Sequence, residues 1–103
     1  MDKLLNLLGL AAKASYLTKG TDTVIEELKH KKLQIVFAGS DCSEKTIDKL
    51  MRKCYFYAVP LCLYYTSDEL SKAVGASIKV IAIKNKQFYG AMKEYLEGKI
   101  YEG

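Results

Sequence analysis

Several residue types are scarce in this sequence, and each scarcity narrows the range of structures. Proline occurs once, at Pro60, and glycine seven times among 103 residues, so no flexible linker divides the chain. The longest apolar run, residues 54–65, contains that proline and falls short of the roughly 20 residues of a membrane span. Three cysteines without a CxxC pair favour free thiols in a reducing cytoplasm. We expect one cytoplasmic domain spanning residues 1–103, with no membrane segment.

The common catalytic and metal-binding motifs are also missing. No G-x-G-x-x-G, P-loop, G-x-S-x-G or H-E-x-x-H string is present, and His30 is the only histidine. Cys42 lies at the start of a predicted helix, where the helix dipole favours a thiolate, but the adjacent Asp41 opposes this effect. A small residue in a capping loop is the simpler interpretation of Cys42. We therefore expect no enzymatic activity, no metal and no cofactor.

The charge balance is mildly basic. Sixteen Lys and Arg residues against twelve Asp and Glu residues give a net charge of +4 and a pI near 8.9. Only Arg52 is an arginine, so contacts with nucleic acid would rely on lysine point charges rather than bidentate guanidinium groups. The composition permits RNA binding without requiring it.

Helical and strand patterns alternate along the chain. The spacing of apolar residues predicts helices over 2–14, 21–32, 43–55 and 86–97, a short helix between Thr66 and Val74, and strands over 16–19, 33–38, 59–65 and 78–83. Apolar strands separated by helices require a sheet that is covered on both faces. The sequence therefore predicts an α/β fold, a three-layer α/β/α sandwich with the order α-β-α-β-α-β-α-β-α.

Local side chains add two finer predictions. Asp41-x-x-Glu44 and Thr66-x-x-Glu69 are expected to cap the helices that they precede. Four tyrosines flank or occupy the predicted third strand, and we expect them to pack in the core rather than to stack on bases. These tyrosines are Tyr55, Tyr57, Tyr64 and Tyr65.

Residues 19–23, with the sequence KGTDT, form the most informative segment. Gly20 allows a tight turn from a strand into a helix, so the first amide groups and polar side chains of that helix project together. Such an end binds phosphate through its N–H groups and its dipole. A plain helix cap, with Thr23-x-x-Glu26 as a capping box, explains the same residues equally well.

Short strings along the chain carry a resemblance to a known family. They are LGLAAKA at 8–14, Gly20, the strand at 33–38, SDCS at 40–43, VP at 59–60 and DELSKAVG at 68–75. Their order and spacing resemble the bacterial YlxQ family, a branch of the kink-turn-binding ribosomal protein superfamily that includes L-seven-Ae, L-thirty-e and Gadd proteins. The resemblance covers residues 4–97 and implies an α/β/α sandwich around a four-stranded mixed sheet.

The resemblance implies RNA binding by the start of the second helix. In the Gly-x-Asn-Glu-x-x-Lys turn of kink-turn binders, polar side chains contact guanines of sheared G·A pairs. Gly20 matches this turn, whereas Asp22 replaces Asn, Thr23 replaces Glu and Glu26 replaces Lys. Asp22 can still accept a hydrogen bond from a guanine N–H, but Glu26 brings a negative charge near phosphates.

The loop after the fourth helix is the second implied RNA contact. Against the family pattern Leu-Gly-x-Ala-x-Gly, Leu70, Ala73 and Gly75 match, and Ser71 replaces the first glycine. We therefore expect RNA contacts from Lys13, Lys19, Gly20, Thr21, Asp22, Thr23, Glu26, Lys29, Lys72, Gly75, Ala76 and Ser77.

The predicted function is thus a small non-catalytic RNA-binding protein associated with the ribosome or with another structured RNA. Its expected partners are RNA and ribosomal or translation-associated proteins. One alternative is a protein–protein interaction module on the same fold, as in the Gadd proteins, which the modest charge and Glu26 favour. Another is a substrate-binding piece, related to accessory domains of RNA methyltransferases, that acts beside a partner.

Overall fold

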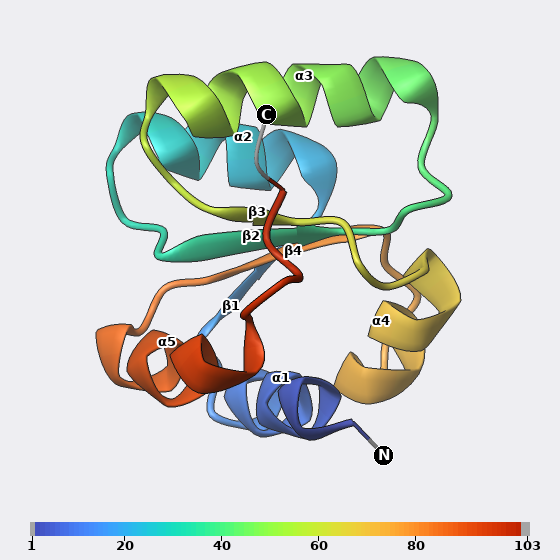
Figure 1. Cartoon of the computed structure of the whole chain (residues 1–103), viewed down its shortest axis with the longest axis vertical. Helices are drawn as coiled ribbons and strands as arrows, with labels where there is room; N and C mark the ends of the chain where they lie inside the picture. The colour runs from blue at the N-terminus through green and yellow to red at the C-terminus, as the bar shows by residue number, and fades with distance from the viewer. Residues whose placement is uncertain (1, 102–103) are drawn as a thin grey trace.

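The computed structural model describes residues 2–101 and confirms the alternation of helices and strands (Figure 1). In chain order the elements are α1 (Lys3–Lys13), β1 (Leu17–Lys19), α2 (Thr21–Lys29), β2 (Ile35–Ala38), α3 (Glu44–Phe56), β3 (Leu61–Cys62), α4 (Ser67–Val74), β4 (Val80–Ile83) and α5 (Lys86–Met92), which continues into the 3₁₀ turn Lys93–Tyr95. None of the helices within the described residues is long and apolar enough to cross a membrane.

The four strands form one mixed sheet in the order β1-β4-β2-β3. Strand β4 runs antiparallel to both β1 and β2, whereas β2 and β3 are parallel. Helices α2 and α3 cover one face of the sheet, and α1, α4 and α5 cover the other (Figure 1). The predicted three-layer sandwich is therefore confirmed, and so is the mixed four-stranded sheet that the resemblance implies.

The alternation of side chains along the central strands creates a separate core on each face. In β2, Ile35 and Phe37 pack against the α1, α4 and α5 layer, whereas Val36 and Ala38 pack against α2 and α3. All residues of β2 and β4 are buried. Two fully covered faces explain why both strands read as continuous apolar runs in the sequence.

Several elements are shorter than the sequence predicts. Strand β3 has two residues instead of the predicted 59–65, because it lies at an edge of the sheet and Pro60 offers no N–H to the ladder. Helix α2 ends at Lys29, and Lys31 then adopts a φ of 56°, which ends the helical path before Lys32. Helix α5 tightens into a 3₁₀ turn after Met92. The differences affect boundaries, not the order of the elements.

The predicted cap of α3 is wrong. Helix α3 begins at Glu44, so Ser43 is its N-cap and accepts a hydrogen bond from the Thr46 N–H at 3.2 Å. Asp41 lies two residues too early and instead accepts two hydrogen bonds from Ser67, at 2.7 Å from its N–H and at 2.6 Å from its hydroxyl. These hydrogen bonds hold the pKa of Asp41 below its ordinary value. Asp41 thus fastens the loop after β2 to the start of α4.

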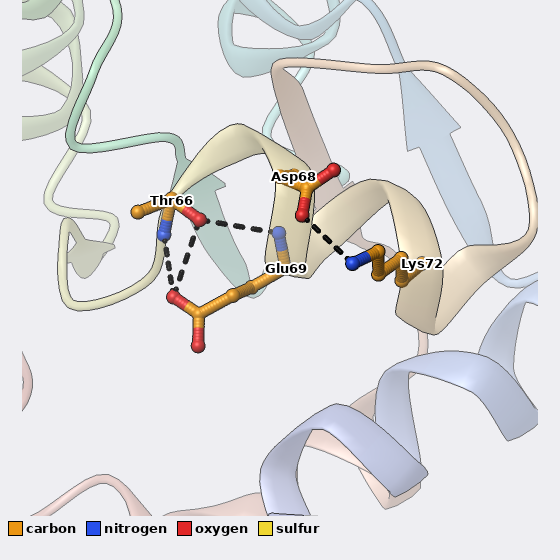
Figure 2. A network of polar contacts seen from close by, with 4 residues as sticks. All are labelled: Thr66, Asp68, Glu69 and Lys72. Atoms are coloured by element: carbon orange, nitrogen blue, oxygen red, sulfur yellow. Dashed lines mark hydrogen bonds and ion pairs between the residues drawn. The ribbon is translucent and has the colours of Figure 1, made fainter.

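The predicted capping box of α4 is confirmed and is drawn in Figure 2. The Thr66 hydroxyl accepts a hydrogen bond from the Glu69 N–H at 3.2 Å, and the Glu69 carboxylate accepts one from the Thr66 N–H at 3.0 Å. In the same view Lys72 reaches back to Asp68, with Nζ and Oδ2 at 3.1 Å. Gly75, with φ of 72°, ends the helix in the left-handed conformation that glycine favours.

The prediction that four tyrosines pack in the core is only half right. Tyr65 is buried and Tyr57 is half-buried, but Tyr55 is 85% exposed and Tyr64 is 58% exposed. Successive residues of a helix lie about 100° apart around its axis. Because Cys54 faces the core, its neighbour Tyr55 faces solvent. Tyr64 follows the early end of β3 and has left the sheet.

Candidate functional site

The turn at Gly20 fixes where α2 begins. Gly20 has φ of 96° and ψ of 143°, a backbone conformation that side-chain-bearing residues rarely adopt. A Cβ atom built at this position would meet nothing within 4 Å. Glycine is therefore required here by the backbone angle and not by a lack of space. The Gly20 N–H donates to the carbonyl of Val80 at 2.9 Å. This bond ties the start of α2 to the first residue of β4.

The first turn of α2 presents polar groups to solvent. Asp22 and Thr23 are exposed, and Thr21 is half-buried. Among residues 2–101 no side chain caps this helix, so the alternative of a Thr23 capping box is excluded and the N–H groups of the first turn have no capping side chain there. On the inner side, the buried Thr18 hydroxyl donates to the Glu27 carboxylate, which fastens α2 to β1.

The loop after α4 is pinned by a residue whose role was not predicted. The Ser71 hydroxyl donates to the Ile78 carbonyl at 2.8 Å and accepts from the Ile78 N–H at 3.0 Å. One side chain therefore closes the loop 75–78 onto the last turn of its own helix. The sequence carries no local signal for this contact, because the two residues are seven positions apart across a loop.

The loop 75–79 lies between the start of α2 and the loop after β2. Its last residue, Lys79, accepts a hydrogen bond from the Gly39 N–H at 2.8 Å, and the next residue, Val80, accepts the one from Gly20. The Cys42 thiol also donates to the Lys79 carbonyl, at 3.7 Å. Burial and the charge of Asp41 raise the pKa of this thiol. Cys42 thus has the structural role in a capping loop that the simpler interpretation predicts.

Two shallow grooves extend this surface across α4. One, of about 520 Å³, lies between α1 and α4 and brings Lys13 next to Lys72 and Gly75. The other, of about 550 Å³, is lined by Lys72, Gly75, Ala76 and Ser77. The helices α1 and α4 pack closely because Gly9 faces Ala73, whose carbonyl oxygen would lie 2.8 Å from an added Cβ.

Most of the residues singled out from the sequence therefore lie at one end of the sheet. Lys29 does not, since it occupies the last turn of α2, about 12 Å along the helix from Thr21. Glu26 lies between, with its carboxylate 3.4 Å from Lys29 Nζ and 3.5 Å from His30 Nε2. The hydrogen bond and the charge of Lys29 lower the pKa of Glu26. Lys29 thus offsets the negative charge of Glu26.

Comparison with known proteins identifies the family. Residues 2–92 match the model of the Ribosomal protein L7Ae/L30e/S12e/Gadd45 family. The chain belongs to this family. A curated relative from Enterococcus faecium, named RNA-binding protein YlxQ, is 34% identical over 96 residues, which are 93% of each chain. A protein of the same name from Bacillus subtilis (strain 168) is 31% identical over 81 residues, 79% of this chain and 81% of that protein.

Solved structures agree with this L7Ae-type assignment. A protein of unknown function from Bacillus halodurans C superposes with a TM-score of 0.89 at 30% identity, covering 94% of this chain and 99% of that one. The Giardia lamblia 15.5kD RNA binding protein superposes with a TM-score of 0.80 at 20% identity, covering 94% and 84%. The second likeness concerns the fold alone. The expected similarity to the YlxQ family is confirmed.

Proposed function

We propose that this chain is a non-catalytic RNA-binding protein of the cytoplasm that holds structured RNA, such as ribosomal RNA, against the end of the sheet where α2 begins. The observation that carries the proposal is the hydrogen bond from Gly20 to Val80, the first residue of β4, which brings the start of α2 to the point where the loop after α4 ends. We call the resulting surface, formed by Lys13 with residues 19–23 and 71–79, the Gly20 surface. The names of the two YlxQ relatives support RNA as the ligand.

The chemistry of the Gly20 surface suits a bent RNA backbone. The free N–H groups of the first turn of α2 bind phosphate oxygens, aided by the helix dipole. Lys13, Lys19 and Lys72 add positive charge on the same side. The exposed Asp22 carboxylate can accept a hydrogen bond from a guanine N–H. Backbone groups and lysines thus position the RNA, and Asp22 contributes base selection.

The three cysteines are consistent with the cytoplasmic setting. Cys42, Cys54 and Cys62 are free and buried, and burial raises the pKa of the Cys54 thiol to about 12. Buried neutral thiols act as small apolar residues and need no oxidising compartment. Within residues 2–101, no group of three or more His, Cys, Asp or Glu side chains is arranged to hold a metal ion.

Salt-dependent binding tests the proposal. The double variant Lys13→Ala, Lys19→Ala is compared with Lys32→Ala, Lys86→Ala, which removes the same charge from exposed positions outside the Gly20 surface. A kink-turn RNA and a duplex of equal length serve as probes, from about 50 to 200 mM salt. We expect the first pair to weaken binding to both RNAs and to reduce the salt slope by about 2, one per lost phosphate contact.

The control pair separates a local effect from a general one. It should leave most of the slope intact, because its lysines make no phosphate contact in the proposed complex. Equal losses in both double variants would assign the binding to net charge alone and would contradict the Gly20 surface as the RNA site.

A further inference from the structure

A separate hollow lies beside α3 and shares no lining residue with the Gly20 surface. It has a volume of about 700 Å³ and is bounded by α3 from Asp48 onward, the loop 58–60, Leu61 and residues 100–101. Its lining is mostly apolar, and we call it the α3 groove. The lining includes Met51, Arg52, Tyr55, Pro60 and Tyr101.

The α3 groove lies at the opposite end of the sheet from Gly20. Leu61, in the groove, pairs with Val36 near the start of β2. Val80, which accepts the hydrogen bond from Gly20, pairs instead with Ala38 at the end of β2. A ligand in the groove therefore leaves the Gly20 surface free.

Aromatic side chains around the groove are unusually exposed. Tyr55 and Tyr101, which line the groove, are 85% and 40% exposed, and Phe56, which lines the hollow on the other flank of α3, is 76% exposed. Exposed aromatic clusters mark interaction sites, because a folded chain gains nothing by leaving such large apolar surfaces in water. Together with Met51 and Arg52, these are the residue types enriched in the cores of protein–protein interfaces.

The charges at the groove favour an acidic partner. Lys49, Arg52 and Lys53 line a hollow of about 380 Å³ on the other flank of α3, and Arg52 also lines the α3 groove itself. The carboxylate that lines the groove belongs to Asp48, which already pairs with Arg52 at 3.3 Å. Both side chains of this pair are well exposed, so the pair is weak and easily exchanged. Arg52 and Asp48 balance within the α3 groove, so the excess of positive charge comes from Lys49 and Lys53 in the adjoining hollow. Over the two hollows together three cations stand against one carboxylate, which suits carboxylates on a partner.

The edge of the sheet beside the groove is already occupied. Ile100 forms an antiparallel bridge with Cys62, and the Tyr101 N–H donates to the Leu61 carbonyl at 2.7 Å. Figure 1 shows this last segment crossing in front of β3 from the layer of α1 toward that of α3. A ligand therefore cannot add a strand to β3 here, and must bind through side chains that enter the groove.

We propose that the α3 groove docks an acidic segment of a partner protein. An aromatic or leucine side chain of the segment sits between Tyr55 and Pro60, and its carboxylates face Arg52, Lys49 and Lys53. The inference is independent of the proposed RNA function, since the two surfaces share no residues. It would give the protein one surface for RNA and a separate one for a protein.

Selection from a random peptide library tests the inference. Phage displaying peptides of about 12 residues, long enough to fill one groove, are selected on the wild-type protein. Phage that also bind the variant Arg52→Glu, Tyr55→Ser are removed. We expect the enriched peptides to combine several Asp or Glu residues with one Phe, Tyr, Trp or Leu. The most enriched peptide, made synthetically, should bind the variant about tenfold or more weakly than the wild type.

A matched control carries the same changes elsewhere. The variant Lys86→Glu, Tyr64→Ser also reverses one exposed lysine and removes one exposed tyrosine, outside the groove. It should bind the peptide as the wild type does. Circular dichroism and binding of a kink-turn RNA, which should stay unchanged in both variants, show that the fold and the Gly20 surface are intact.

Any of five outcomes would overturn the inference. The selection could yield no common sequence or a basic one, or the peptide could bind both variants equally. Light scattering could show a dimer of the wild type that Arg52→Glu, Tyr55→Ser abolishes, which would make a second copy the occupant. A single-stranded RNA of about 12 nucleotides could lose affinity only in that variant, which would make the exposed tyrosine a base-stacking platform.

Discussion

The Gly20 surface and the α3 groove are built by different kinds of interaction. At the Gly20 surface, hydrogen bonds of the backbone and of small side chains hold three loops together, through Gly20, Gly39, Ser71 and Asp41. At the α3 groove, large side chains stand on a helix whose own packing is complete, because Leu50 and Cys54 fill the core beneath them.

The Gly20 surface and the α3 groove therefore depend on their residues in different ways. The shape of the Gly20 surface is set by the backbone, so a substitution acts by moving loops and affects stability and binding together. The α3 groove is made of exposed side chains, so truncation there removes a contact and leaves the fold nearly unchanged, within about 0.5 kcal/mol. Substitutions of Gly20, Ser71 and Asp41 test how the Gly20 surface depends on its backbone and its hydrogen bonds.

The largest effect is expected from Gly20→Ala. The φ of 96° at Gly20 is strained for alanine, which costs about 1–3 kcal/mol of unfolding free energy. If the turn relaxes to relieve this strain, the start of α2 moves away from the loop after α4. We expect affinity for a kink-turn RNA to fall about fivefold or more, equivalent to about 1 kcal/mol.

Gly90→Ala is the matched control for this substitution. Gly90 lies inside α5, and an added Cβ would meet nothing within 4 Å. Alanine there should stabilise the protein by about 0.5–1 kcal/mol and leave RNA binding unchanged. Urea unfolding and fluorescence titration measure both quantities. An unchanged RNA affinity in Gly20→Ala would mean that the turn does not position the binding surface.

A smaller effect is expected from Ser71→Ala, which frees the loop 75–78. The loss of two hydrogen bonds to Ile78 should cost about 1–2 kcal/mol of stability. Ser43→Ala removes the N-cap of α3 and should cost a similar amount, about 1 kcal/mol. Only the first variant should weaken RNA binding, because only Ser71 shapes the Gly20 surface. Equal RNA affinities in the two variants would refute a positioning role for Ser71.

The smallest effect concerns acid and Asp41. Hydrogen bonds from Ser67 lower the pKa of Asp41 in the folded protein below its ordinary value of 3.8. A lowered pKa contributes stability that is fully present above that value and disappears as the pH falls through the folded-state pKa. Asp41→Ala should therefore be less stable than the wild type at about pH 6, and the difference should shrink toward about pH 2.

Comparing the wild type with Asp41→Ala isolates the contribution of Asp41 to stability from those of the other carboxyl groups. Asp2 and Glu26 also have lowered pKa values, but they are present in both proteins and cancel in the difference. Urea unfolding at a series of pH values gives the measurement. A difference in unfolding free energy that stays constant down to pH 2 would show that the charge of Asp41 has no part in holding α4.

The sequence was sufficient for the element order because the signals that determine it are local. The apolar runs of β2 and β4 and the Thr66 capping box lie within a few residues, and both predictions are confirmed. The cap of α3 was missed because Asp41 and Ser43 are both good caps, and only the distant Ser67 decides between them.

The site was harder to predict from the sequence, because its contacts join residues that are far apart along the chain. The resemblance located Gly20 and Gly75, but the contact between Ser71 and Ile78 depends on the path of a loop. The α3 groove needs three segments that are far apart in the chain, α3, the loop 58–60 and residues 100–101. Tyr55 was expected to pack inside because a tyrosine next to a predicted strand usually does.

Mapping where RNA binds tests the Gly20 surface most directly. Amide chemical shifts of the ¹⁵N-labelled protein can be followed while a kink-turn RNA is added. If RNA binds the Gly20 surface, the largest changes occur at residues 19–23 and 71–79, with little change at Arg52 and Tyr55 in the α3 groove. Changes concentrated on residues 49–60 instead would contradict the Gly20 surface as the RNA site, because the RNA would then occupy the surface assigned to a protein partner.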